Sequence, residues 1–299
     1  MTKMIFQFKR MKNNSNIENQ INGKVIFAGA GPGDPDLITM KAVQWLQKAD
    51  VVLTDRLVSE VILKTYVKRD ANIIYVGKQC RRGISTPQQT INELIIKYAF
   101  QNKLVVRLKG GDVSIFSNIM DELQTVVMNN IPYEIVPGVT AALGAAAYAG
   151  IPLTARGYAT AVRFLTYYKS DVVSDEYWNE LAKTDDTLIF YMSAETLDKV
   201  VEKLKANNIA NDKMLAVIEQ ATTPFQNVHV SNLYEYEENM KGRSFISPSL
   251  VIIGKVVSLH NQFSWLANNS CSDYYFKPIT SPVIPIADIQ NEKKHVSRA

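Results

Sequence analysis

Short runs of apolar and β-branched residues, each ending in a turn signal, recur along the first half of this chain. Such runs predict buried strands. The expected strands cover residues 25–28, 51–54, 73–76, 104–108 and 135–136. Helical patterns lie between them, from about 37, over 118–128 and over 144–149. Strands that alternate with helices indicate a parallel α/β layer.

The helix expected over 86–100 has the clearest start signal. Thr86 reads as its N-cap, Pro87 as its first helical residue, and Gln89 as the partner that completes a capping box. The sequence therefore predicts a helix that is capped by Thr86 and has Pro87 as its first helical residue.

The second half predicts a further α/β unit. Its strands are expected at 161–166, 187–191, 214–218 and 250–253, with a helix over 195–206. We expect four parts: a flexible N-terminal extension over 1–22, an N-terminal α/β domain over 23–153, a C-terminal α/β domain over 154–266, and a loosely ordered tail over 267–299.

Composition narrows the classes of function. The 299 residues carry a formal net charge of +4 and no dense basic stripe, which argues against a nucleic-acid partner. Cys80 and Cys271 form no Cys-x-x-Cys pair and the three histidines are scattered, so a metal site is not expected. No apolar run is long enough to span a bilayer. We expect a cytoplasmic protein that binds no membrane.

Residues 105–112 carry the main chemical signal. Val105 and Val106 form the body of a strand, and Arg107 and Lys109 share one of its faces because side chains alternate. Gly110-Gly111-Asp112 then form a loop, which by itself fits either a ligand site or a tight turn with a capping carboxylate. Two similar loops follow other strands, at 29–36 and 137–141. We expect the three loops to converge at the ligand crevice of an open α/β sheet.

The loop Gly29-x-Gly31-x-Gly33 suggests a dinucleotide, but it fits that ligand poorly. Asp34 stands where the fingerprint requires glycine, and Pro32 and Pro35 remove amides that would bind a pyrophosphate. The carboxylates of Asp34 and Asp36 would also repel a phosphate. An adenosyl ligand without phosphates suits this loop better, because it tolerates the prolines and favours acceptors for its ribose and amine groups. NAD(P) remains the minor alternative.

The same residues resemble the tetrapyrrole methylases, and among them the uroporphyrinogen-III C-methyltransferases. The resemblance runs from about Lys24 to about Val257. Its motifs are Gly29-Ala30-Gly31-Pro32-Gly33-Asp34-Pro35, Asp55-Arg56-Leu57-Val58, Val106-Arg107-Leu108-Lys109-Gly110-Gly111-Asp112, Val136-Pro137-Gly138-Val139-Thr140-Ala141, Tyr148-Ala149-Gly150-Ile151-Pro152-Leu153-Thr154, Tyr191-Met192 and Thr222-Thr223-Pro224.

The resemblance implies two α/β domains with the cofactor cleft between them, and a homodimer. It implies that S-adenosyl-L-methionine gives two successive methyl groups to uroporphyrinogen III, with precorrin-2 and S-adenosylhomocysteine as products, for sirohaem or cobalamin biosynthesis. By position, the implied cofactor contacts are Pro32, Gly110, Gly111, Asp112, Ile115, Thr140, Ala141, Met192 and Ala221.

The implied catalytic residues are Asp55 as proton acceptor and Lys78 as proton donor. A carboxylate could assist deprotonation of a pyrrole nitrogen if burial raises its pKa, although Asp55 could instead cap a helix or pair with Arg56. Lys78 could instead only attract substrate carboxylates. A substrate with eight carboxylates needs cations, and the candidates are Arg81, Arg82, Arg107, Lys109, Arg156 and Arg163, of which we select Arg156.

The chain departs from the family pattern on the substrate side. The family has Phe-Gly-Arg-Gly and an acidic pair where this chain has residues 116–122, so Asn118 replaces an arginine, and Ile119 and Met120 replace glycines. We assign Asn118 and Asp121, together with Arg156, to the substrate site. The departures leave two alternatives open: a methylase of this fold with another substrate, and a cofactor-binding protein without catalysis.

Overall fold

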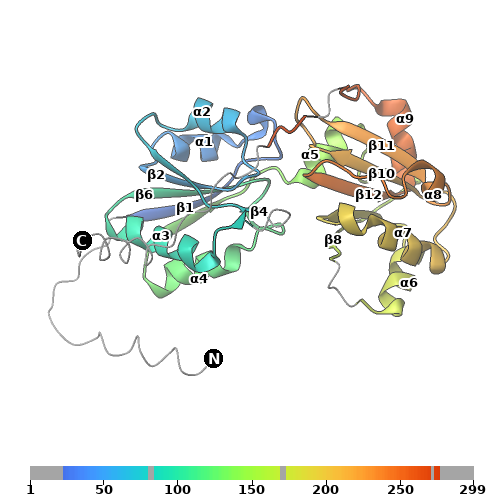
Figure 1. Cartoon of the computed structure of the whole chain (residues 1–299), viewed down its shortest axis with the longest axis horizontal. Helices are drawn as coiled ribbons and strands as arrows, with labels where there is room; N and C mark the ends of the chain where they lie inside the picture. The colour runs from blue at the N-terminus through green and yellow to red at the C-terminus, as the bar shows by residue number, and fades with distance from the viewer. Residues whose placement is uncertain (1–22, 80–83, 169–172, 271–272, 277–299) are drawn as a thin grey trace, which may run out of the picture.

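The computed structural model describes residues 23–79, 84–168, 173–270 and 273–276, and it contains two α/β units (Figure 1). Each unit has one five-stranded sheet with helices on its faces. The predicted fold class is therefore confirmed. Three parts of the prediction lie outside the described residues. They are the extension over 1–22, Arg81 with Arg82, and the tail except for residues 267–270 and 273–276.

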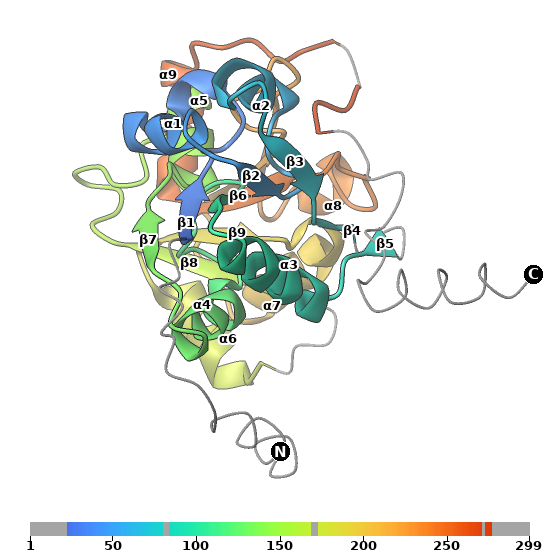
Figure 2. The same cartoon turned by 90° about the vertical axis from the view of Figure 1, so that its left-hand side faces the viewer.

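The N-terminal sheet has the strand order β3-β2-β6-β1-β7, and every pairing in it is parallel (Figure 2). Its strands are β1 Lys24–Gly29, β2 Val51–Thr54, β3 Asn72–Tyr75, β6 Leu104–Lys109 and β7 Tyr133–Val136. Its helices are the 3₁₀ helix η2 Pro35–Leu37, α1 Met40–Leu46, α2 Glu60–Tyr66, α3 Gln88–Phe100 and α4 Ile119–Met128. A small antiparallel pair joins β4 Lys78–Gln79 to β5 Ile84–Ser85.

Alternate residues of the central strands face opposite helix layers. Ile26 and Val106 pack in the core that contains α1 and α2, whereas Val25 and Val105 pack in the core that contains α3 and α4. Both faces of β1 are therefore covered, which explains its uninterrupted apolar sequence. The same alternation sends Arg107 toward α4.

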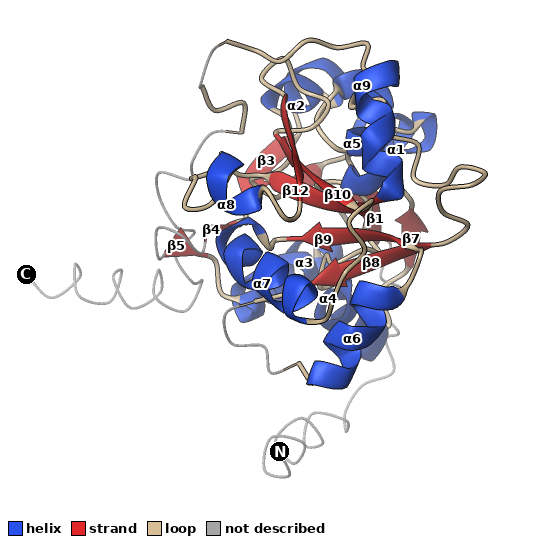
Figure 3. Cartoon of the chain, turned by 90° about the vertical axis from the view of Figure 1, so that its right-hand side faces the viewer, coloured by secondary structure: helices blue, strands red, loops and turns tan. Residues whose placement is uncertain are grey.

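The C-terminal sheet is mixed, with the order β11-β10-β12-β9-β8, in which only the β8–β9 pairing is parallel (Figure 3). Its strands are β8 Val162–Thr166, β9 Thr187–Tyr191, β10 Met214–Glu219, β11 Asn227–Asn232 and β12 Ser249–Gly254. Its helices are α5 Ala141–Tyr148, α6 Asp175–Lys183, η4 Ala194–Thr196, α7 Leu197–Ala206, α8 Tyr236–Asn239, η5 Lys255–Leu259 and α9 His260–Phe263.

Three details of the fold differ from the sequence expectations. The predicted capping box is wrong, because α3 begins at Gln88 and its N-cap is Pro87, without a side-chain cap. Helix α5 belongs to the core of the C-terminal sheet, which favours a unit boundary near Thr140 over the expected one after Leu153. The expected tail includes packed residues, since Asn268 binds both the N–H and the carbonyl of Val228.

Candidate functional site

The loops that follow β1, β6 and β7 meet at one edge of the N-terminal sheet. Gly31 and Gly111 form an antiparallel bridge in which the Gly111 N–H donates to the Gly31 carbonyl at 2.8 Å. A Cβ on Gly29 would lie 2.6 Å from the carbonyl oxygen of Gly111 and 2.7 Å from the Cα of Gly138. Only residues without a side chain allow three backbones to touch in this way. The predicted convergence of the three loops is confirmed.

Asp112 fixes the geometry of two of these loops. One carboxylate oxygen accepts the N–H of Gly138 at 2.8 Å, and the other accepts the N–H and the hydroxyl of Ser114. Burial opposes the charge, but these hydrogen bonds outweigh it and lower the pKa of Asp112 below its usual value. The Asp112 side chain therefore serves to hold the loops in this structure.

The N-terminal loops contact the C-terminal unit. The phenol oxygen of Tyr191, at the end of β9, lies 2.7 Å from Oγ1 of Thr140 and accepts the N–H of Ala142 at 3.1 Å. The Asp34 N–H donates to Oγ1 of Thr222, in the turn after β10, at 3.0 Å. The candidate site therefore lies where the two units meet.

Strained backbone is concentrated at this junction. Three asparagines with positive φ, at 102, 130 and 208, lie just beyond α3, α4 and α7, where a left-handed residue commonly ends a helix. Among the described residues, the other non-glycine positions with positive φ lie in strand-end loops, and these are Phe116, Asn118, Met192, Gln220 and Thr222. Side chains of this size rarely adopt such angles outside functional sites. Thr222 belongs to a motif of the resemblance, whereas Gln220 had no signal in the sequence.

Asp55, the candidate proton acceptor, is paired with a buried arginine. Nη2 of Arg107 donates to its carboxylate at 2.6 Å, and Arg107 also contacts Glu122 at 3.1 Å. The side chain of Asp55 is 25% exposed, whereas that of Arg107 is 2% exposed. Burial opposes the charge of Arg107, but the two carboxylates outweigh it and raise its pKa. In this structure Asp55 is therefore a partly exposed carboxylate that forms an ion pair with a buried arginine.

Pairing with protein carboxylates occupies three of the candidates for substrate binding. Lys109 lies 3.3 Å from Glu122, and burial together with the charge of Arg107 lowers the pKa of Lys109. Arg163 pairs with Glu180 and with Asp186, the latter at 2.6 Å. The expectation that Arg107, Lys109 and Arg163 could bind substrate carboxylates is wrong for these three residues, because protein carboxylates already occupy them.

The Asp34 carboxylate in the loop after β1 binds groups of the protein itself. The Asp34 carboxylate accepts the Asp36 N–H and the hydroxyl of Tyr148. Burial and the neighbouring Asp34 raise the pKa of Tyr148 to about 12. Asp34 therefore ties η2 to α5 through its side chain.

The other predicted positions lie around the junction or outside it. Pro32 lies against α5, since a Cβ on Gly144 would be 2.6 Å from its Cγ. Ile115 and Ala141 are half-buried, Ala221 is buried, and Met192 is 49% exposed, with its sulfur 2.8 Å from the hydroxyl of Tyr168. Gly110 packs closely against Leu57, which follows Asp55.

The predicted substrate residues are at the surface. Asn118, at the N-terminus of α4, and Asp121, in its first turn, are both exposed, as is Arg156. Lys78 lies in β4, and its side chain is outside the part that the structure describes.

These groups fit an adenosyl sulfonium ligand better than a dinucleotide. Arg107 and Lys109, on the strand that leads into the Gly110 loop, are both held by carboxylates, so neither is available for a phosphate. The half-buried Pro32 and Ile115 supply apolar surface, and Thr140 and Tyr191 supply hydroxyls. This set of groups requires no anionic ligand.

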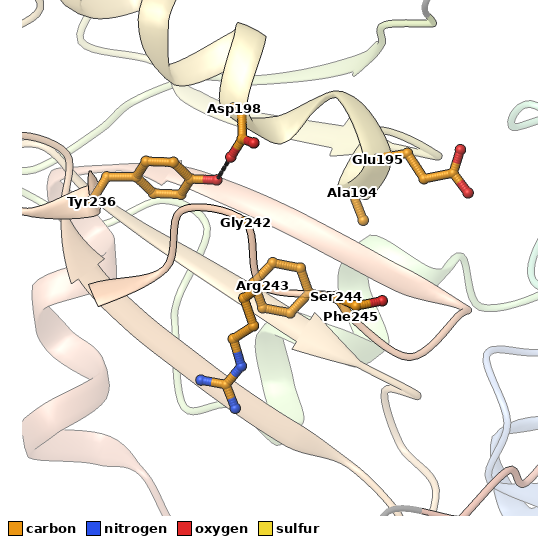
Figure 4. A pocket seen from close by; sticks show the side chains of 8 residues that line it. All are labelled: Ala194, Glu195, Asp198, Tyr236, Gly242, Arg243, Ser244 and Phe245. Atoms are coloured by element: carbon orange, nitrogen blue, oxygen red, sulfur yellow. Dashed lines mark hydrogen bonds between the residues drawn. The ribbon is translucent and has the colours of Figure 1, made fainter. Parts of the chain in front are cut away.

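A cavity of about 350 Å³ lies elsewhere, within the C-terminal unit (Figure 4). It is lined by Ala194, Glu195, Asp198, Tyr236 and residues 242–245. None of the predicted site residues is among these. In the described part of the chain, no three side chains of metal-binding type are grouped, and no helix has the length and apolarity to cross a bilayer.

The fold and the junction define a class of protein: two α/β units with a ligand site between a parallel and a mixed sheet. Comparison with known families then identifies the family to which the chain belongs. The model of the tetrapyrrole (corrin/porphyrin) methylases matches residues 24–237, so the chain belongs to the tetrapyrrole methylase family. The predicted resemblance to this family is confirmed.

Individual proteins agree with this assignment. A siroheme synthase from Acinetobacter baylyi is 45% identical over 244 residues, which cover 82% of this chain and 53% of that protein. The chain spans about half the length of the curated relatives it matches.

Solved structures show the same fold. A uroporphyrin-III C-methyltransferase from Thermus thermophilus, complexed with S-adenosylhomocysteine, is 31% identical with a TM-score of 0.65, over 79% of this chain and 93% of that one. A cobalt precorrin-4 methyltransferase of cobalamin biosynthesis is 26% identical with a TM-score of 0.70, over 81% and 99%.

Proposed function

We propose that the chain converts uroporphyrinogen III to precorrin-2 by two successive methyl transfers from S-adenosyl-L-methionine. The observation that carries the proposal is the meeting of three glycine loops with the strained turns at Met192 and Thr222. The match to the methylase family and the likeness to a uroporphyrin-III C-methyltransferase support it.

The cofactor supplies a methyl group already activated by the sulfonium charge, so the protein's task is alignment. Gly110, Gly111 and Thr140 offer backbone and hydroxyl groups along one side of the junction, and Met192 and Ala221 close the other. Asp112 keeps the loops at fixed separation through the Gly138 N–H. The site is thus assembled before the ligand arrives, which lowers the entropic cost of binding.

Asp55 acts as the proton acceptor. Its pairing with Arg107 at 2.6 Å fixes the direction of the carboxylate, while its partial exposure leaves one oxygen for the substrate. Removing the proton of the pyrrole nitrogen makes the attacking ring carbon more electron-rich. Lys78 remains the predicted proton donor.

The first test is the reaction itself. Incubation with S-adenosylmethionine and enzymatically made uroporphyrinogen III is expected to give the absorbance of the dimethylated product. Asp55→Asn should lower the rate by about 10²-fold or more, since general-base assistance contributes about that much. Asp70→Asn, at an exposed carboxylate that pairs with Lys68, should keep the wild-type rate. Wild-type protein that forms no product would contradict the proposal.

A second candidate function is methylation of a different tetrapyrrole. The observation that favours it is the surface at the start of α4, where Asn118 has positive φ and Met120 is 68% exposed. An uncharged amide and a thioether there would suit a substrate with fewer carboxylates. Binding of S-adenosylhomocysteine without turnover of uroporphyrinogen III would favour this candidate. The homodimer and the cytoplasmic location remain predictions.

A further inference from the structure

Residues 273–276 cross the junction between the two units, although they lie outside the stretch that matches the family model. Gln220 holds this segment by both ends of its side-chain amide. Its Nε2 donates to the Asp273 carbonyl at 2.8 Å, and its Oε1 accepts the Tyr275 N–H at 2.8 Å. Gln220 is 1% exposed and Phe276 is 3% exposed, so the segment is anchored in the fold.

The hydroxyl of Tyr275 reaches the N-terminal unit. It lies 2.9 Å from Oγ of Ser59, at the start of α2, and it donates to the Gly33 carbonyl at 3.5 Å. Either hydroxyl can be the donor of the shorter bond. Oγ of Ser59 also accepts the Val61 N–H at 3.1 Å, so Ser59 binds the first turn of α2 and Tyr275 at the same time. Segment 273–276 runs beside α2 as a red-orange trace between the units (Figures 1 and 2).

Each contact of Tyr275 is next to a residue of the candidate site. Gly33 follows Pro32, Gln220 precedes Ala221, and Ser59 ends the loop that begins at Asp55. Tyr275 therefore connects segments of both units: its hydroxyl contacts the loops after β1 and β2, and its backbone N–H binds the turn after β10.

We propose that Tyr275 is a positioning residue for the cofactor site: its hydroxyl holds the Pro32 loop and the Asp55 loop against a segment that Gln220 fixes, through the Tyr275 N–H, to the turn after β10. The inference rests on the proposed function. It assigns to the C-terminal segment a part in cofactor affinity. Tyr275 itself touches neither the cofactor nor the reacting atoms in this account.

Tyr275→Phe isolates this role. The ring is held by an edge contact with Phe276 at 5.2 Å and by Phe225 at 6.3 Å, so phenylalanine keeps the ring in place and loses only the hydroxyl bonds. Tyr274→Phe is the matched control, because Tyr274 is adjacent and 58% exposed. Gln220→Leu is the second variant, because it releases the same segment from the other unit.

The test is calorimetric titration of the full chain with S-adenosylhomocysteine, together with steady-state kinetics. We expect Tyr275→Phe and Gln220→Leu each to weaken binding about fivefold to tenfold, and the double variant to be less than multiplicative, because both act through one segment. KM for S-adenosylmethionine should rise while kcat at saturating cofactor stays within about twofold. A merely structural role would lower the melting temperature without this split between KM and kcat.

Two results would overturn the inference, and they can be told apart. If the wild-type chain binds the ligand and Tyr275→Phe binds it equally well, this inference fails and the proposed function stands. If the wild-type chain does not bind the ligand, the proposed function fails and the inference fails with it.

Discussion

Arg107 connects the candidate catalytic carboxylate to the core, because it contacts Asp55 at the junction and Glu122 inside α4. Removing one member of a buried charge cluster leaves the others unpaired, and this typically costs about 3–5 kcal/mol. We expect Arg107→Met to lower the free energy of unfolding in urea by about that amount.

The control for this experiment is Arg163→Met. Arg163 also contacts two carboxylates, Glu180 and Asp186, but its side chain is 32% exposed. Solvent-exposed pairs contribute about 0–1 kcal/mol, so the expected loss is small. Equal losses in the two variants would contradict the buried-cluster account.

Asp112 gives a pH dependence whose sign follows from its lowered pKa. Its hydrogen bonds from Ser114 and Gly138 favour the carboxylate in the folded state, so its contribution is complete above the unfolded value of 3.8. That contribution is lost as the pH falls through the lower folded value. Asp112→Asn should therefore be about 1–2 kcal/mol less stable at pH 7, and this difference should shrink below about pH 4. Urea midpoints at pH 7 and pH 3 measure it; a difference that is independent of pH would contradict the assignment.

At the scale of the elements, the loop after β7 depends on a glycine with no room for a side chain. A Cβ on Gly138 would lie 2.8 Å from the Cα of Gly29, so Gly138→Ala must push two strand-end loops apart. We expect the variant to bind S-adenosylhomocysteine at least tenfold more weakly in calorimetry. Gly157→Ala has positive φ but open space around it, and should cost only about 1 kcal/mol of stability, with unchanged binding. Unchanged binding by Gly138→Ala would show that the loop spacing is not critical.

The strands predicted from the sequence include those whose apolar runs are buried on both faces and the edge strands β3, β7 and β8, which also carry short apolar runs. Strands β1, β2, β6, β9, β10 and β12 all appear where such runs occur. Strand β11, at Asn227–Asn232, was missed because it lies at the sheet edge and its valines alternate with polar residues. That alternation was the available signal. The capping-box prediction was wrong because Thr86 is buried and Pro87 takes the N-cap position of α3.

The site was predictable in outline and not in its charge pairing. Glycine loops mark where backbones approach, and the strand period correctly placed Arg107 and Lys109 on one face. Their partner Glu122 lies on a helix that follows the strand, and a helix's rotation about its axis is set by packing rather than by a local motif. The left-handed turns at Met192, Gln220 and Thr222 oppose local propensity, so tertiary contacts alone reveal them.

At the scale of the whole molecule, the two units share the site and part of their structure. Helix α5 begins at the junction and packs in the C-terminal core, and Tyr191 binds Thr140 at the start of that helix. The relative placement of the units therefore determines whether the N-terminal loops and the C-terminal turns face one ligand.

A crystal structure of the chain with S-adenosylhomocysteine would show whether the N-terminal loops and the C-terminal turns bind one ligand. We expect the adenosyl group to lie between the loops carrying Pro32 and Gly111 and the turns carrying Met192 and Ala221. Its sulfur should be directed toward Asp55. Ligand bound instead in the cavity beside Asp198 and Arg243, with the junction unchanged, would contradict it.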